Sequence, residues 1–385
     1  MKTPSTLCGI LAAIFTTAAP ALEEGVRPEP VAAVNPAEDN HPKIQLAILL
    51  DTSGSMQGLI NQARTQLWKI VNEFISAKQN GQTPYVEVAL YEYGNDAQPA
   101  KDHWIRQIQP LTRDLDKISE DLFKLTTNGG EEYCGAVIKR AIKDLAWDKR
   151  PDTYKAIFVA GNEPFNQGPV DPLTSCREAI AQGVIVNTIH CGNEAEGRRG
   201  NWHTGPALAD GKFLNIDQNQ AVAAITAPQD AELVKLNEQL NKTYVWYGAR
   251  GGIARENQVA QDFNAAKAAP AAAAQRAATK ASANYYNAEA DLVDRAKDKE
   301  FKLSGLKAEE LPEEMKKMSE AERKDYLERK TAERTDLQTK ILALNKAREA
   351  YVVQQLKQQG KETLDTAITK AVREQAAKKR IQWEQ

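Results

Sequence analysis

Three largely aliphatic runs, each of which stops abruptly at polar residues, limit most strongly how this chain can fold. They occupy residues 46–50, 156–160 and 184–189, and they end in "DTSGS", "GNEP" and "HCGN". Continuous runs of this kind are typical of parallel strands that helices cover on both faces. Stretches with apolar residues at helical spacing separate the runs, so strand and helix alternate over about 180 residues. We therefore predict an α/β fold with a doubly wound, mostly parallel six-stranded sheet.

Shorter patterns complete the predicted sheet and its helices. Strands are expected at residues 85–94, 103–111 and 211–217, and helices at residues 58–77, 115–125, 136–147, 175–182 and from 221. In doubly wound folds, ligands bind at the carboxyl ends of the strands, near the point where the strand order reverses. The three polar segments that follow the aliphatic runs are such ends. A functional site is therefore expected among them.

The segment "DTSGS" offers one carboxylate and two hydroxyls from a single turn, on Asp51, Ser53 and Ser55. These are hard oxygen ligands, which favour Mg²⁺, Ca²⁺ or Mn²⁺ over softer metals. Mg²⁺ keeps several waters and is typically held by one or two carboxylates, so three side chains from one loop would leave positions open for an incoming group. The alternative interpretation is that the three residues only cap the next helix and stabilise a turn.

The sequence "DTSGSM" after a buried strand resembles the Asp-x-Ser-x-Ser signature of von Willebrand factor A (VWA) domains, and the resemblance covers about residues 43–225. It implies the doubly wound, Rossmann-like sheet predicted above. It also implies a metal-ion-dependent adhesion site (MIDAS), in which Asp51, Ser53 and Ser55 bind a divalent cation, Mg²⁺ first and Ca²⁺ or Mn²⁺ as alternatives.

Two further ligands that the resemblance implies differ in this chain. A threonine is expected in the loop before the helix at residue 136 and an aspartate after the aliphatic run at residues 156–160. The chain has these residues near the two places: Thr126, Thr127, Glu131 and Glu132 in the loop, and Gly161, Asn162 and Glu163 after the strand. We predict that Glu131 and Asn162 complete the site, because this exchange keeps the summed ligand charge at two negatives. Glu131 as a solvated loop residue is the alternative.

The leading functional hypothesis is an exported protein, without enzymatic activity, that binds a protein ligand through this cation, with a carboxylate of the ligand completing the coordination shell. A structural envelope subunit that acts through its C-terminal helices is the alternative, and a metal-dependent hydrolase is a weaker one. Hydrolysis would need a base or nucleophile near the ion. His190 and Cys191 lie at a strand end, and both are expected to be structural. A net charge of −2 suggests no nucleic-acid partner.

The N-terminus has the pattern of a secretory leader. Lys2 precedes an apolar stretch, and "AAPA" supplies the small residues that signal peptidase needs. We predict a signal peptide over residues 1–21, a flexible linker over 22–42 and a VWA domain over 43–228, in a periplasmic or secreted protein with no transmembrane segment after cleavage. An oxidising compartment permits one disulfide among Cys134, Cys176 and Cys191, and the pairing is left open.

After the predicted VWA domain the strand pattern ends. We predict a connecting helical segment over residues 229–269, with "YVWYGARGG" joining the two parts, and an all-α region over 270–385. Ser319 and Glu322 have the spacing of a capping box, and Gly360 is suited to end a helix. A helical hairpin or short coiled coil is expected there, and oligomerisation through these helices is a further hypothesis.

Overall fold

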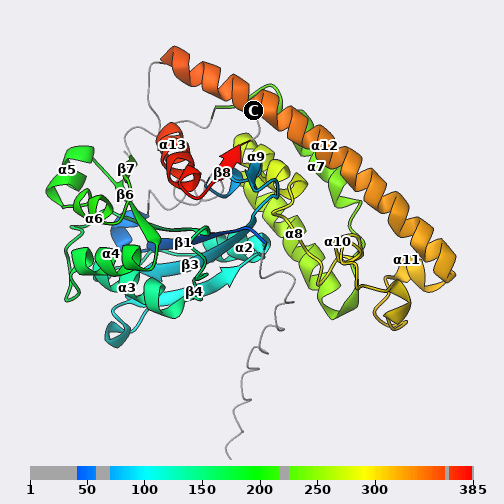
Figure 1. Ribbon diagram of the computed structural model, residues 1–385, viewed down its shortest axis with the longest axis horizontal. Helices are drawn as coiled ribbons and strands as arrows, with labels where there is room; N and C mark the ends of the chain where they lie inside the picture. Colours follow the sequence, from blue (N-terminus) through cyan, green and yellow to red (C-terminus); the bar gives the residue numbers. More distant parts are fainter. Residues whose placement is uncertain (1–40, 58–69, 217–224, 360–363, 384–385) are drawn as a thin grey trace, which may run out of the picture. The chain divides into compact units, whose positions relative to one another are not determined.

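A six-stranded sheet in the order β4-β3-β1-β5-β6-β7 forms the first half of the folded chain (Figure 1). All neighbours in it are parallel except β3 and β4. The computed structural model describes residues 41–57, 70–216, 225–359 and 364–383. The strands are β1 Lys43–Asp51, β3 Tyr85–Tyr93, β4 Ile105–Thr112, β5 Tyr154–Gly161, β6 Val184–Cys191 and β7 Phe213–Ile216. This confirms the predicted fold class.

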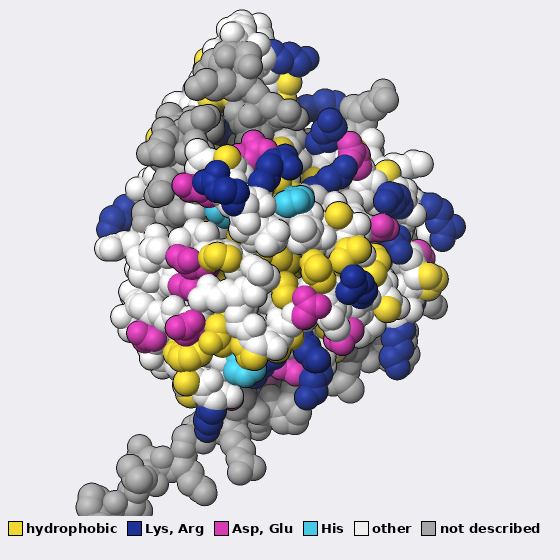
Figure 2. All heavy atoms as spheres, turned by 90° about the vertical axis from the view of Figure 1, so that its left-hand side faces the viewer, with side chains coloured by type: hydrophobic (Ala, Val, Ile, Leu, Met, Phe, Trp, Pro, Cys, Tyr) yellow, Lys and Arg dark blue, Asp and Glu magenta, His cyan; other side chains and the backbone are white. Residues whose placement is uncertain are grey.

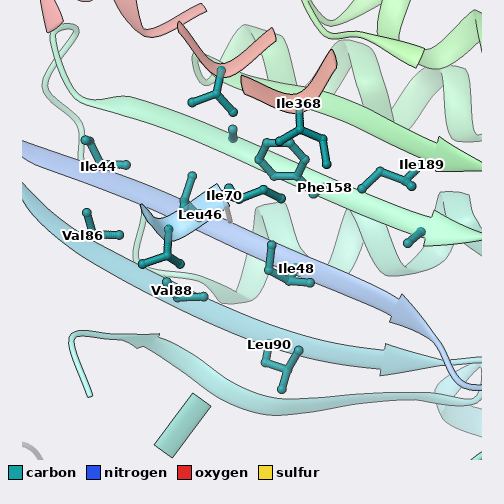
Figure 3. Close-up of a cluster of buried hydrophobic side chains, with 14 of the residues drawn as sticks. Ile44, Leu46, Ile48, Ile70, Val86, Val88, Leu90, Phe158, Ile189 and Ile368 are labelled. Carbon is teal, nitrogen blue, oxygen red and sulfur yellow. The ribbon is translucent and has the colours of Figure 1, made fainter. Parts of the chain in front are cut away.

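Apolar side chains on each face of the sheet form a separate core, as expected for strands covered on both sides. On one face they pack against α3 (Cys134–Asp144) and α4 (Pro172–Ala181). On the other face they pack against α2 (Leu115–Lys124) and α13 (Leu364–Ala377). Figure 3 shows this second core, with Ile368 of α13 beside Phe158 of β5.

The helix predicted over residues 58–77 falls mostly outside the described residues, which resume at 70 with a short helical end. The leader, the linker except for residues 41 and 42, most of the segment expected to begin a helix at residue 221, and Gly360 also lie outside them. Among the described residues, no helix has both the length and the apolar character needed to cross a membrane.

The second half of the chain is helical, as predicted. Ser319 and Glu322 form the predicted capping box, because the backbone N–H of Ser319 donates to Glu322 Oε2 at 2.7 Å and that of Glu322 to Ser319 Oγ at 3.3 Å. The remaining helices are α5 Glu194–Arg199, α6 Thr204–Leu208, α7 Asp230–Asn241, α8 Gly248–Ala268, α9 Pro270–Ala281, α10 Leu292–Arg295, α11 Glu313–Lys316 and the 40-residue α12 Glu320–Gln359.

The last helix and strand return to the sheet instead of extending the helical region. Ile368, Val372 and Ala376 of α13 are buried in the sheet core, and Gln375 accepts a hydrogen bond from Tyr154 Oη at 2.8 Å. The strand β8 (Ile381–Trp383), an exception to the all-α prediction, pairs antiparallel with β2 (Ala77–Gln79). The helices α7 to α12 are thus inserted between the sheet's last strand and a helix that covers one of its faces.

A buried polar interface joins α2 to α8 and α9. Arg276 of α9 contacts Asp116 of α2 (Nη1 to Oδ1, 2.8 Å) and Asp262 of α8 (Nε to Oδ1, 2.6 Å). Lys280 of α9 also binds Asp262, at 2.8 Å. Both cations are buried, so removing any one member would leave an unpaired charge.

All three described cysteines are buried free thiols. Cys134 and Cys176 lie in the core on the α3 and α4 face, whereas Cys191 lies in the core on the opposite face. The sheet therefore separates Cys191 from the other two. Burial raises the pKa of Cys176 to about 12 and also raises the pKa of Cys134 and Cys191, which keeps the thiols protonated and unreactive.

Candidate metal centre

Asp51 is the last residue of β1 and carries the only carboxylate of the "DTSGS" turn. It is fully buried at 0% exposure. The backbone N–H of Ser53 donates to Asp51 Oδ1 at 2.7 Å, and that of Thr52 to the carbonyl of Tyr93 at 2.9 Å. The strand pairing and this turn together direct the polar residues to the carboxyl end of the sheet, where the sequence placed the site.

A chain of hydrogen bonds links the turn to the end of β5. Ser53 Oγ lies 2.9 Å from Ser55 Oγ, and Ser55 Oγ donates to Asn162 Oδ1 at 3.0 Å. Asn162 directly follows β5, which is the neighbour of β1 in the sheet. Four of the five residues predicted to bind the metal, Asp51, Ser53, Ser55 and Asn162, therefore lie together.

One oxygen of Asp51 has no partner. Oδ2 is buried and makes no hydrogen bond with the described residues. Two glycines keep its surroundings open. A Cβ at Gly161 would lie 3.1 Å from Asp51 Oδ2 and 2.5 Å from Tyr93 Oη, and a Cβ at Gly94 would lie 2.9 Å from Asp51 Oδ1. Buried polar oxygens are rarely left unsatisfied, so this one points to a missing partner.

Burial raises the pKa of Asp51 to about 7, and nearby Glu132 adds to the rise, while Ser53 and the nearby backbone dipole of Asn162 oppose it. Desolvation disfavours the charged form of a carboxyl. A bound cation acts in the opposite direction, because it stabilises the carboxylate. The carboxyl group of Asp51 is thus in an environment that lacks a positive charge.

The structure places the two glutamates of the preceding loop differently. Glu132 is buried at 8% exposure, and it lies beside Asp51, because a Cβ at Gly94 would meet both Glu132 Cγ at 2.8 Å and Asp51 Oδ1 at 2.9 Å. Burial, Glu163 and Glu131 raise the pKa of Glu132, whereas the side chain of Ser53 lowers it. Glu131 is exposed and accepts a hydrogen bond from Gln167 Nε2 at 3.2 Å. The second carboxylate beside the turn is therefore Glu132.

The earlier threonines of this loop contribute through the backbone. The carbonyl of Thr126 accepts from Asn95 Nδ2 at 2.9 Å, and Asn95 Nδ2 also approaches the carbonyl of Thr52 at 3.3 Å. Asn128 donates its backbone N–H to the same Thr52 carbonyl at 3.0 Å. These bonds hold the loop against the "DTSGS" turn, so that the loop that carries Glu132 is kept next to it.

An aromatic group adjoins the site, and the sequence patterns did not indicate it. The ring of Tyr133, the residue after Glu132, lies edge-on to His103 (5.9 Å between centroids) and Trp104 (5.6 Å). His103 and Trp104 have φ angles of 58° and 53°, in a region that residues other than glycine rarely adopt. The carbonyl of Trp104 accepts from the backbone N–H of Gly94 at 3.1 Å. The segment with these unusual φ angles is thus bonded to Gly94, which adjoins Asp51, and it places the aromatic group next to the site.

The face on the α5 and α6 side of Figure 1 carries mixed charges. Figure 2 shows acidic and basic side chains interspersed there, with hydrophobic ones between them. No field of a single sign covers this face, in keeping with the chain's small net charge.

His190 and Cys191 occupy structural positions. His190 is buried, its Nδ1 lies 2.9 Å from Asn215 Oδ1, and its ring packs edge-on against Trp202 at 5.8 Å. Trp202 in turn donates from Nε1 to the carbonyl of Glu163 at 2.7 Å. These contacts anchor the segment after β5 that carries Asn162.

The donor set fits a hard divalent cation. Among the described residues, no three His, Cys, Asp or Glu side chains gather closely enough to hold a metal by themselves. A cation here would therefore depend on hydroxyl oxygens as well as on carboxylates, and this is the ligand chemistry that Mg²⁺, Ca²⁺ and Mn²⁺ accept. The unpartnered Asp51 Oδ2 and the hydroxyls of Ser53 and Ser55 supply it.

Comparison with known families matches residues 45–224 to the von Willebrand factor type A domain. A comparison with curated proteins finds no match. Among solved structures, BatB from Bacteroides thetaiotaomicron is 14% identical over 46% of this chain and 92% of its own, with a TM-score of 0.35. Proximal thread matrix protein 1 from the mussel byssus, with zinc in its MIDAS motif, is 17% identical over 47% and 45%, with a TM-score of 0.33. A von Willebrand factor type A protein from Catenulispora acidiphila is 14% identical over 47% and 40%, also at 0.33.

Proposed function

Residues 45–224 of this chain form a von Willebrand factor type A domain, and from that premise we propose that the protein binds a protein partner through a divalent cation. Domains of this family are commonly protein-interaction modules that carry a MIDAS. The proposed ligands from the turn are Asp51, Ser53 and Ser55. Mg²⁺ is the first choice of metal, with Ca²⁺ and Mn²⁺ as alternatives, because all these groups are hard oxygens.

The observation that carries the proposal is the unpartnered Oδ2 of Asp51. This oxygen is buried without a hydrogen bond among the described residues, and burial raises the pKa of the carboxyl to about 7. Placing an unpaired carboxylate in a protein interior costs free energy unless a positive charge compensates it. A cation from solution supplies that charge, and it accounts for why the position is an aspartate.

We assign the second carboxylate of the site to Glu132 and keep Asn162 as the neutral ligand or as a support for Ser55. Glu132 is buried beside Asp51, and both lie next to Gly94, whereas Glu131, the residue predicted from the sequence, is exposed and accepts a hydrogen bond from Gln167. The ligand charge of two negatives, which the sequence predicted, is unchanged by this reassignment.

A partner enters because the protein's own side chains leave positions on the cation open. Mg²⁺ requires six oxygen ligands in near-octahedral geometry and otherwise keeps water. A carboxylate of a protein ligand can replace one of these waters, which joins the two proteins through the metal. We further propose that this happens outside the cytoplasm, in the periplasm or after secretion, because the leader pattern at residues 1–21 predicts export.

Calorimetric titration with Mg²⁺ tests the site. We expect Asp51→Ala to abolish binding and Glu132→Ala to weaken it at least about tenfold. Glu131→Ala is the matched control from the same loop and should bind as the wild type does. Unchanged affinity in Asp51→Ala would overturn the metal site. Weakened binding in Glu131→Ala but not in Glu132→Ala would restore the original assignment.

Pull-down from an envelope extract, with Mg²⁺ or with EDTA, tests the partner. A protein retained by the wild type in Mg²⁺ but released by EDTA and not retained by Asp51→Ala supports the proposal. Retention that is insensitive to EDTA and to Asp51→Ala supports the alternative, a structural subunit that docks through its helices.

The exposed apolar residues of α8 favour the oligomerising form of that alternative, as a second activity of the same chain. Ile253 and Phe263 on this helix are 72% and 66% exposed. Deleting the chain after Pro270 is not a clean test of it, because the deletion also removes Ile368 and Val372 from the sheet core. Single surface substitutions on α8 avoid this damage.

A further inference from the structure

Helix α8 buries polar side chains and exposes large apolar ones. Its buried residues are Gly251, Gln258, Gln261 and Ala265. Its exposed residues include Ile253 at 72%, Val259 at 57% and Phe263 at 66%. A helix at a protein surface normally buries its apolar face and exposes its polar one, so this arrangement requires a reason.

The inner face of α8 is fixed by specific polar contacts. Gln258 Nε2 donates to Tyr285 Oη at 3.1 Å, and Ser119 of α2 donates to Gln261 Oε1 at 2.9 Å. Asp262 binds both Arg276 and Lys280. Turning the helix to bury its apolar face would break all of these contacts and leave buried charges unpaired, which costs several kcal/mol. The apolar face is therefore held outward.

Scattered exposed apolar residues are ordinary, but a gathered group marks a contact surface. Only five large hydrophobic side chains are exposed among the described residues, and three of them, Ile253, Val259 and Phe263, lie on α8. At 100° per residue, Val259 and Phe263 are one turn apart on the outer face, and Ile253 lies at its edge. The face is long enough to pack along another helix.

Charged residues at the two ends of this face indicate which helix packs against it. Glu256 and Lys267 are both exposed and have no ion-pair partner in the described part of the chain. Lys267 follows Glu256 by eleven positions, or about three helical turns, so both lie on the outer face, one toward each end. A helix that matches the face must have a cation opposite Glu256 and an anion opposite Lys267, and α8 itself, run antiparallel, has both.

We propose that α8 is a dimerisation helix that pairs antiparallel with the α8 of a second copy of this chain. The two-fold axis passes between residues 261 and 262. Residues that lie equally far on either side of this axis face each other across the dimer. Glu256 of each copy therefore faces Lys267 of the other, and Phe263 faces Ala260. The large Phe263 thus opposes the small Ala260, Val259 faces Asn264, and the two ion pairs flank these contacts.

This arrangement is an isologous contact, in which one surface serves both copies and the assembly closes at two. It involves no residue of the metal site, so it goes beyond the proposed function and stands or falls independently of it.

Sedimentation velocity on the full chain tests the proposal. We expect a species of twice the chain mass of 42.5 kDa and conversion to monomer in Phe263→Glu. Val353→Glu, at another exposed hydrophobic on α12 (47%), is the matched control and should remain dimeric. Circular dichroism of each variant verifies that the fold is retained.

A charge swap makes the test specific to the antiparallel register. Glu256→Lys and Lys267→Glu should each weaken the dimer at least about tenfold, because like charges then face each other. The double variant should restore it. A wild type that stays monomeric up to about 100 μM, a dimer that survives Phe263→Glu, or a double variant no better than the single ones would overturn the proposal. Loss of a different co-purifying protein in Phe263→Glu would assign the face to that protein and overturn it as well.

Discussion

Two desolvated aspartates in this chain have opposite environments. Asp51 at the end of β1 is fully buried, has one oxygen without a partner, and has a pKa raised to about 7 by burial. Asp262 on α8 is also desolvated, but Arg276 and Lys280 bind it and hold its pKa down to about 2. Desolvation disfavours the charged form of both carboxyl groups, but only Asp262 has cations of the chain beside it.

The difference separates a structural charge from a functional one. At Asp262 the chain supplies its own cations, and the result is a permanent connection between α8 and α9. At Asp51 the chain supplies only backbone and hydroxyl donors, so compensation must come from outside. A buried carboxylate that its own fold leaves uncompensated is a candidate for binding a metal.

The largest effect is expected from removing the shared cation of the structural site. Arg276→Ala leaves Asp116 and Asp262 buried with less positive charge and should reduce the free energy of unfolding by about 3–5 kcal/mol. Denaturant unfolding measures it. Arg250→Ala, which breaks an exposed pair with Glu289, is the control and should cost less than about 1 kcal/mol. Similar losses in both variants would mean that burial does not distinguish the two pairs.

The pH dependence of the metal-free protein should reveal Asp51. Its pKa in the folded state is raised above the ordinary value of 3.8 to about 7. The folded state therefore holds a proton that the unfolded state releases, and stability should fall as pH rises from about 4 to 7, by roughly 4 kcal/mol at most.

Asp51→Asn removes this dependence, and in EDTA at about pH 8 it should unfold at higher denaturant than the wild type. Parallel pH profiles of the wild type and Asp51→Asn in EDTA would show that the pKa of Asp51 is not raised in the folded state.

A bound metal ion should neutralise the carboxylate of Asp51, as Arg276 and Lys280 neutralise that of Asp262. At a Mg²⁺ concentration one hundred times the dissociation constant, the wild type should gain about 2.7 kcal/mol of stability. Asp51→Asn should gain little. Thermal or denaturant unfolding with and without Mg²⁺ measures both. An equal gain in the two proteins would place the cation elsewhere.

The smallest effect is expected from protonating the paired aspartate in acid. The pKa of Asp262 is lowered to about 2, so its charged form contributes stability above about pH 4 that is lost as pH falls toward 2. The loss in acid should amount to about 2 kcal/mol, and Asp262→Asn, which leaves the buried Lys280 without this anion, should destabilise the protein at neutral pH by more than that. Its sign is opposite to that of Asp51→Asn in EDTA. If both substitutions stabilise the protein, the two environments are not different in the way described.

The fold was largely predictable because the sheet repeats a strong pattern. All six strands of the main sheet were expected within three residues of their observed ends, and three of them are aliphatic runs that, when buried on both faces, have few other interpretations. The return of α13 was not predictable. Ile368, Val372 and Ala376 have helical spacing, but spacing shows only that a helix has an apolar side and not which surface covers it.

The site was predictable in part for a similar reason. Asp51, Ser53 and Ser55 belong to one short motif with a strand before it, and the strand order brings Asn162 beside them. Glu131 and Glu132 are consecutive residues in an irregular loop, where no periodicity indicates which one faces inward. Bonds from Asn95 and Asn128 to the "DTSGS" turn and the surrounding loop decide this, and they connect distant parts of the chain.

By itself, the sequence determined the alternating strands and helices, the turn that carries Asp51 and the capping box at Ser319, because each depends on neighbours a few residues away. Only the tertiary structure decided that Glu132 is the inner glutamate, that α13 covers the sheet and that α8 buries its polar face. Each of these depends on partners far along the chain, and contacts between distant residues leave no regular spacing in the sequence.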